Sequence, residues 1–313
     1  MTAPDPASRK SPALARFLLH TALECAERLP SSIAQGIADQ VASAEYRLSP
    51  ARRRAVLGNL ETIGASGHPR LRARRDRERC ARAVFRAYHR HIAEFLEQRR
   101  LTRQGWHERF RFEGTEKLYA ALEEGRGAVI AASHLGNWEL AGLAMARLGF
   151  RVHVVTGTQW NPLLHDAVRA LKEGSGVDVS TPRDGFRPLL ASLRRGALVV
   201  LLVDGDIYTR GVPAPFFGRA VSFPAGPALL ARRSGAPLLH AHASRDGSAH
   251  RVVFDGADRP DRRLTLERDV ARLTARIAAA QERNIAAQVD AWCIFRPFFG
   301  SGREPAAPVI DAA

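Results

Sequence analysis

The feature that most constrains the fold is the alternation of short aliphatic runs with helix-forming stretches after Phe112. Runs of this kind predict buried strands, and strands that alternate with helices are typical of an α/β protein. We therefore expect a mostly parallel central sheet flanked by helices on both faces. The six runs are Ala128–Ala132, Val152–Val155, Val177–Val179, Leu198–Val203, Leu238–Ala243 and Arg251–Phe254. The helical stretches are Trp138–Leu148, Leu163–Lys172, Gly185–Arg194, Ala225–Ser234 and Leu264–Val289.

The residues before this alternation have a helical pattern, interrupted by Pro30, Pro50 and the turn at 64–69. Helices are expected at 13–28, 31–46, 50–63 and 76–98. We interpret these helices as a helical N-terminal cap on the α/β core, with no separate domain of their own. We expect a flexible tail at 1–12, a single domain at 13–299 and a second tail at 300–313. Within the domain, the cap comprises residues 13–98 and the α/β core residues 112–299.

The composition excludes a disordered chain and a small scaffold held together by disulfides. With 45% hydrophobic and 25% charged residues among 313, the chain has an ordinary globular composition. Its three cysteines, Cys25, Cys80 and Cys293, form no CxxC pair, so neither a disulfide framework nor a metal knuckle is indicated.

Positive charge is concentrated in one segment. The net charge is +15, and the segment Arg47–Arg111 carries 18 arginines against six acidic residues, a net of +12. Such a patch attracts nucleic acid, an anionic membrane surface or an acidic carrier protein, or it is a solvated face. The stretch Leu14–Leu29 is too rich in ionisable residues to span a membrane and predicts an amphipathic helix.

The candidate catalytic residues lie where the first predicted core strand ends, in the segment Ser133–Glu139. His134 follows the strand, Gly136 provides a turn, and Asn137 is a good N-cap for the next helix. With Glu139 in the first helical turn, its carboxylate can reach back to the imidazole. A histidine oriented by a carboxylate is equipped to act as a general base.

This segment resembles the His-x4-Asp/Glu (HX4D/E) motif of the bacterial lipid A biosynthesis acyltransferases, the late enzymes of the lauroyl and myristoyl type. The mycobacterial phosphatidylinositol mannoside acyltransferases belong to the same superfamily and share the motif. The resemblance extends to Arg53–Leu60, 112–114, 125–127, Leu193–Asp206, Pro215–Gly218 and 230–237. The chain departs from the family in its ionisable N-terminal helix, and Val289–Trp292 replaces the family's Pro-Glu-x-Trp.

The resemblance implies a membrane-associated O-acyltransferase that needs no metal or prosthetic cofactor. An acyl carrier protein or coenzyme A thioester would be the donor, and a hydroxyl of a membrane lipid or glycolipid the acceptor. His134 would act as general base, and Glu139 would hold its tautomer. The protein would lie peripherally on the cytoplasmic face of the bacterial inner membrane, attracted to its anionic surface and binding no specific nucleic acid.

Other residues are weaker candidates for substrate binding. The amides near Gly136 and Asn137, or a cation, are candidates for stabilising an oxyanion; the cations considered are Arg169, Lys172 and Arg183. Asp204 and Asp206, after the strand at 198–203, either bind the acceptor headgroup, brace His134 or form a plain turn. Phe216 and Phe217 either line an acyl pocket or belong to the core.

Two other classes of function compete with acyl transfer. Asp204 and Asp206 are spaced like the metal-binding pair of a nucleotide-sugar glycosyltransferase, which would leave the His134 segment unexplained. Alternatively, the Arg47–Arg111 patch would serve a nucleic-acid binder, although few aromatic residues are interleaved with its arginines. No third ligand accompanies His240 and His242, so no metal site is expected there.

Overall fold

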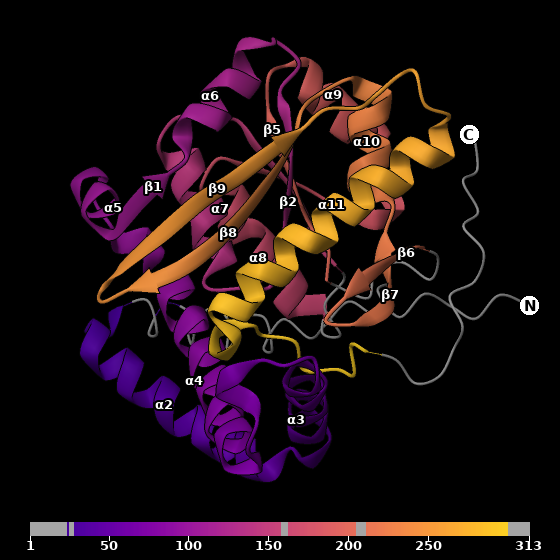
Figure 1. The fold of residues 1–313 in the computed structure, drawn as a ribbon. Coiled ribbons are helices and arrows are strands. Elements are labelled where there is room, and N and C mark those ends of the chain that lie inside the picture. The colour runs from indigo at the N-terminus through magenta and orange to yellow at the C-terminus, as the bar shows by residue number, and fades with distance from the viewer. Residues whose placement is uncertain (1–23, 25–27, 158–161, 205–210, 300–313) are drawn as a thin grey trace, which may run out of the picture.

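The fold is built around a seven-stranded sheet with the strand order β1-β9-β8-β2-β5-β3-β4 (Figure 1). The computed structural model describes Glu24 and residues 28–157, 162–204 and 211–299. The strands of this sheet are β1 (Phe110–Glu113), β2 (Ala128–Ala132), β3 (Val152–Val155), β4 (Val177–Ser180), β5 (Leu198–Leu202), β8 (Leu238–Asp246) and β9 (Ala249–Asp258). All neighbours pair in parallel except β8 and β9, which form an antiparallel hairpin. The predicted α/β class with a mostly parallel sheet is confirmed.

The central strands are buried on both faces, which is why their sequences are continuously apolar. All five residues of β2 are buried. Alternate residues of β2 enter two different cores: Val129 and Ala131 face one side, and Ala128 and Ile130 the other.

Helices cover both faces of the sheet (Figure 1). On the face of Ile130 lie α6 (Thr115–Glu123), α7 (Trp138–Arg147) and α8 (Pro162–Glu173). On the opposite face lie α9 (Arg187–Arg194), α10 (Gly226–Ser234) and α11 (Leu266–Ala287). Each predicted core helix therefore has a counterpart in the structure, and α6 is an addition.

A two-stranded antiparallel sheet, β6 (Gly211–Phe216) and β7 (Arg219–Pro224), packs against α11. Phe216 and Phe217 lie in an aromatic cluster with Trp292, Phe298 and Phe299. The sequence predicted neither this hairpin nor β1.

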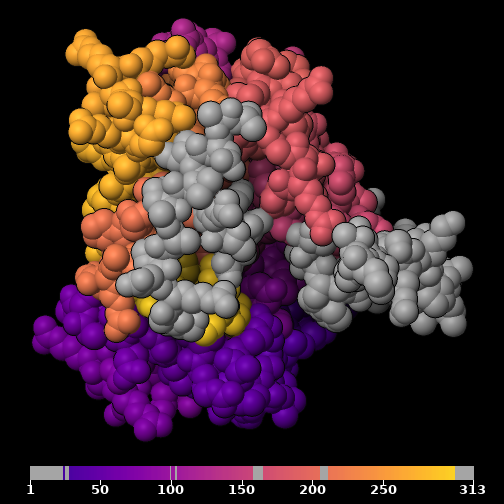
Figure 2. Space-filling view, turned by 90° about the vertical axis from the view of Figure 1, so that its right-hand side faces the viewer, coloured from indigo at the N-terminus to yellow at the C-terminus, as the bar shows by residue number. Residues whose placement is uncertain are grey.

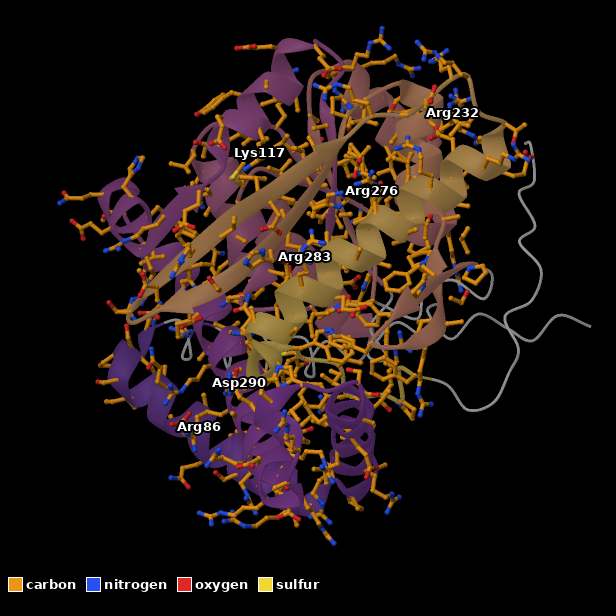
Figure 3. All side chains as sticks on the ribbon, viewed as in Figure 1. Arg86, Lys117, Arg232, Arg276, Arg283 and Asp290 are labelled. Atoms are coloured by element: carbon orange, nitrogen blue, oxygen red, sulfur yellow. The ribbon has the colours of Figure 1, made fainter. Side chains whose placement is uncertain are left out.

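The N-terminal helices α2 (Ser31–Leu48), α3 (Pro50–Ala65) and α4 (Arg74–Glu97) form one end of the molecule (Figures 1 and 2). They agree with the predicted helices at 31–46, 50–63 and 76–98, whereas most of the predicted helix 13–28 lies outside the described residues. Ion pairs of Asp39 with Arg90 (2.6 Å) and Arg86 (3.9 Å) connect α2 to α4, and Arg70, in the short helix between α3 and α4, pairs with Asp290 of the C-terminal segment (2.9 Å). Figure 3 labels Arg86 and Asp290. Among the described helices, none has the length and apolarity needed to cross a bilayer.

Candidate active site

His134 lies in the turn that joins β2 to α7, as the sequence predicted. Gly136 adopts a left-handed conformation (φ 60°), and a Cβ at this position would lie 2.3 Å from the carbonyl oxygen of Ala243. Only glycine satisfies both conditions. Asn137 caps α7 by accepting a hydrogen bond from the amide of Leu140 (3.2 Å). These two residues fix the course of the chain on either side of the histidine.

Asp204 is the carboxylate that contacts the imidazole. Its Oδ1 lies 2.7 Å from Nδ1 of His134, and its two oxygens accept from the His134 amide at 3.1 and 2.9 Å. The sheet explains this contact, because Ala132 of β2 pairs with Leu202 of β5. His134 and Asp204 each follow these paired residues by two positions. Of the candidates at this strand end, Asp206 lies outside the described residues.

The environment of Asp204 favours its ionised form. Burial alone would raise the pKa of this carboxyl, since its side chain is 1% exposed. The charge of His134 and hydrogen bonds from His134 and Trp292 outweigh burial and lower the pKa below its usual value. Nε1 of Trp292 donates at 2.8 Å, and the guanidinium of Arg296 donates to the backbone carbonyl of Asp204 at 2.9 Å. The Asp204 carboxylate beside Nδ1 of His134 favours a proton on that nitrogen. The other ring nitrogen, Nε2, is then left for a substrate.

Glu139 does not contact His134 in this structure, which differs from the orientation expected from the sequence. Its carboxylate binds the ammonium of Lys172 at 2.8 and 3.0 Å, and Lys172 also donates to Thr156 (3.1 Å). The reason is that Glu139 lies on the side of α7 that faces α8 and the end of β3. Asp204 reaches the imidazole from the neighbouring strand.

An apolar cavity of about 500 Å³ opens beside His134, between the sheet and helices α4, α7 and α8. Its polar lining includes His134, Glu139 and Lys172. Its apolar lining comes from strands and helices alike and includes Ile92, Phe95, Ile130, Trp138, Met145, Val152, Val154, Val168, Leu198, Val200 and Phe254. The Trp138 ring and the imidazole pack in a T-shaped arrangement, with ring centroids 4.8 Å apart. The site therefore places a carboxylate-bound imidazole in the wall of an apolar cavity whose lining is suited to a hydrocarbon chain.

Several other predicted binding residues lie away from this cavity. Neither Arg169 nor Arg183 is in its lining: Arg183 is exposed, and the half-buried Arg169 pairs with Glu173 (2.8 Å). Phe216 and Phe217 are on the other side of the sheet, in the aromatic cluster of the core. The amide of Gly136 already donates to the carbonyl of Ala291 (3.2 Å), so the structure does not offer it as a free oxyanion donor.

The two histidines of β8 each face a carboxylate. His240 lies 2.8 Å from Asp258, and His242 lies 3.0 Å from Asp255. Among the described residues, no group of three or more potential ligands is placed to hold a metal ion.

Two groups that sequence reasoning missed support the active-site turn. Trp292 holds Asp204, and the only sequence signal for it was its place in the degenerate Asp-x-Trp of the C-terminal segment. Glu94 of α4 is buried and accepts from the Asn137 side chain (2.8 Å), and it also pairs with Arg245 and with His250 (3.4 Å). A buried glutamate on a helix carries no local signal of the partners that it will meet.

His91, one turn before Glu94, makes the stability of the fold sensitive to pH. Burial is the main cause that lowers the pKa of His91 to about 3, and nearby Arg245 and His250 lower it further against the opposing charge of Glu94. The unfolded chain, with an ordinary histidine pKa near 6.5, binds one more proton between these values. The folded state is therefore stabilised above about pH 6.5 and loses this contribution as the pH falls toward 3.

We expect the His91→Gln variant to lose this dependence. Between pH 6.5 and 4.5 the slope of the unfolding free energy should fall by about 1.4 kcal/mol per pH unit, the value for one proton. Urea unfolding at a series of pH values measures the slope. His107→Gln, at an exposed histidine of α5 (Arg103–Arg109), is the matched control and should keep the wild-type slope. An unchanged slope in His91→Gln would mean that His91 protonates in the folded state.

The fold and the site together define an α/β protein with a carboxylate-bound histidine above an apolar cavity, and comparison with known proteins gives its family. The sequence profile of the family "Bacterial lipid A biosynthesis acyltransferase" matches residues 4–300, so the chain belongs to this family. It is 32% identical over 189 residues to the phosphatidylinositol mannoside acyltransferase of Mycobacterium tuberculosis (strain CDC 1551 / Oshkosh), covering 59% of this chain and 58% of the relative. The corresponding protein of Mycolicibacterium smegmatis (strain ATCC 700084 / mc(2)155) is 30% identical over 188 residues, covering 58% and 60%. The chain thus matches about three fifths of the length of these relatives.

Proposed function

We propose that this protein transfers a fatty acyl group from a thioester to a hydroxyl of a membrane lipid or glycolipid. The observation that carries the proposal is the His134–Asp204 pair beside the apolar cavity, whose wall includes His134. The family supports it, because its members are named as acyltransferases. The cavity would hold the acyl chain and so bring the thioester carbon to the imidazole.

In this mechanism Nε2 of His134 takes the proton of the acceptor hydroxyl as its oxygen attacks the thioester carbon. A C–O bond forms and the carbonyl oxygen becomes an oxyanion; the C–S bond then breaks, and the leaving thiolate receives the proton from the imidazolium. Asp204 stabilises the imidazolium through Nδ1. Lys172, a cation of the cavity wall, is our candidate for stabilising the oxyanion, and Glu139 would position it.

The test is transfer of a labelled palmitoyl group to a membrane lipid extract by the purified protein. Palmitoyl-coenzyme A and palmitoyl-acyl carrier protein are supplied in parallel, and lipid mass spectrometry identifies the product. We expect a new lipid ester with one of the donors and no effect of a chelator. If no ester forms with either donor, the proposal is wrong.

A metal-dependent glycosyltransferase fits the site less well. Both Asp204 oxygens already accept hydrogen bonds from His134 or Trp292, so a metal would have to displace them. If a nucleotide sugar were consumed, and if chelation abolished and manganese restored this reaction, the glycosyltransferase would replace our proposal.

We also propose that the cap helices rest on the membrane surface. One row of α2 carries Ile33, Ile37, Val41 and Leu48, and all four are exposed, Leu48 to 80%. An exposed apolar row on a helix, beside a segment of +12 net charge, is suited to an anionic lipid surface. The occupant we assign to this row is the lipid interface, in agreement with a lipid acceptor that stays in the bilayer.

We expect the triple variant Ile33→Ser, Ile37→Ser, Val41→Ser to bind vesicles more weakly, whether the vesicles are anionic or neutral. Reversal of Arg72, Arg74 and Arg75 to Glu should weaken binding only to anionic vesicles, since each basic residue near such a surface contributes about 1 kcal/mol. Arg77 is not substituted, because its guanidinium donates to the carbonyls of Leu71 and Arg72 and its loss would disturb the local structure. Co-sedimentation at low and high salt separates the two contributions.

The control for the vesicle experiment is Tyr119→Gln, which removes an equally exposed aromatic side chain from α6, outside the cap. This variant should bind as the wild type does. If the α2 variant binds normally, the row does not contact the lipid. If the wild type binds no anionic vesicles at low salt, the proposed contact with lipid is wrong.

A further inference from the structure

The cavity beside His134 runs along helix α7 and away from the active site. Ala132 and Leu202 line it near the carboxyl ends of their strands, and Leu198 and Val152 line it at the opposite ends of theirs. With a strand rise of about 3.3 Å per residue, the distance from Leu202 to Leu198 is roughly 13 Å. A hydrocarbon chain that entered at His134 would therefore extend along α7.

Gly142 lies at the middle of this path. It lines the cavity one turn after Trp138 and one turn before Met145, which both line it as well. A Cβ built on Gly142 meets no atom within 4 Å, its chain neighbours and the nearby backbone of its own helix aside. The space that a side chain would take here is thus part of the free volume between the His134 end and the opposite end of the cavity.

A glycine at this position is unfavourable for the helix itself. Gly142 is in the interior of α7, where glycine is less stable than alanine, and its backbone has no positive φ that would require glycine. The helix geometry and its neighbours would thus both accept a side chain. What glycine provides is open space in the cavity.

We infer that Gly142 sets the length of the acyl chain that the cavity accepts. This inference rests on the proposed function, because it assumes that the cavity holds the acyl chain. A longer side chain at this position would close the passage beside α7. Long chains would then lose their binding site beyond Gly142, whereas short chains would still fit near His134.

The test measures the binding of octanoate, decanoate, dodecanoate and palmitate to wild type and Gly142→Leu, by displacement of a fluorescent fatty acid. In the wild type the affinity should rise up to palmitate, by about fourfold for each methylene that enters the cavity. In Gly142→Leu the rise should end at a shorter chain. The affinity for palmitate should fall about tenfold or more, and that for octanoate should fall much less, because octanoate places fewer methylenes beyond Gly142. Acyl thioesters of the same lengths should show the same order in kcat/KM.

Gly36→Leu is the matched control, at an exposed glycine of α2 that has equally open space and lies outside the cavity lining. It should keep the wild-type length profile. Gly142→Ala, which favours the helix and adds one methyl group, gives a smaller shift in the same direction and covers the case in which the leucine variant does not fold. If wild type binds palmitate and both Gly142 variants keep its length profile, the inference is wrong and the proposed function stands. If wild type binds no fatty acid, the acyl cavity is wrong and this inference falls with it.

Discussion

We expect the His134→Ala variant to transfer acyl groups about 10² to 10⁴ times more slowly than the wild type, the usual contribution of a positioned general base. The imidazole is held by Asp204 at 2.7 Å, so its Nε2 is already directed for proton transfer. Without this base the acceptor hydroxyl must attack while it still holds its proton. Initial rates at saturating donor and acceptor measure the loss.

His242→Ala is the matched control for this variant. His242 also lines the cavity and also faces a carboxylate, Asp255 at 3.0 Å, yet it lies on β8 and not in the β2–α7 turn. Its loss should change the rate much less than the loss of His134. Fatty-acid binding should survive in His134→Ala, because the apolar lining is intact. A folded His134→Ala enzyme with nearly normal turnover would exclude His134 as the base.

The sequence predicted the position of His134 because the determinants of that turn are local. A strand buried on both faces has a continuous apolar sequence, and Gly136 and Asn137 each mark a backbone conformation or a cap that depends on few neighbours. The same locality explains why β2 and β3 were predicted with the bounds that they have in the structure.

The partner of His134 is not a local property, and here spacing along the chain was a poor guide. Glu139 is five residues from His134, but its side chain meets Lys172 of α8. Asp204 is 70 residues away and is brought to the imidazole by the pairing of β2 with β5. Sequence reasoning left a bracing role for Asp204 open. It did not favour this role, because the strand order that brings Asp204 to His134 is known only from the structure.

The β6–β7 hairpin was missed because its sequence contradicts strand propensity. Gly211, Pro213 and Pro215 disfavour a central strand, but a two-stranded sheet tolerates proline on its free side. Packing against α11 stabilises the hairpin. This packing also places Phe216 and Phe217 in the core, away from the cavity for which they were candidates.

We expect Asp204→Asn to lower turnover by about 10² to 10⁴, because the corresponding change in a carboxylate–histidine pair leaves the wrong tautomer and an unsupported imidazolium. The carboxylate now accepts from the His134 amide, from Nδ1 and from Trp292. An asparagine has one acceptor oxygen for these donors, and its amide group would face another donor. The variant should also lose about 1–3 kcal/mol of stability, the cost of leaving a buried donor unsatisfied.

The catalytic and structural effects of Asp204 are separable through Trp292→Phe. This change removes one hydrogen bond from the same carboxylate and leaves its charge beside His134. It should cost comparable stability, yet it should lower turnover about tenfold or less, since the imidazolium keeps its counter-ion. Thermal unfolding gives the first quantity and initial rates give the second. If the two variants lose turnover in proportion to their loss of stability, Asp204 supports only the fold. If Asp204→Asn alone falls by two or more orders of magnitude, the negative charge on Nδ1 is what the reaction requires.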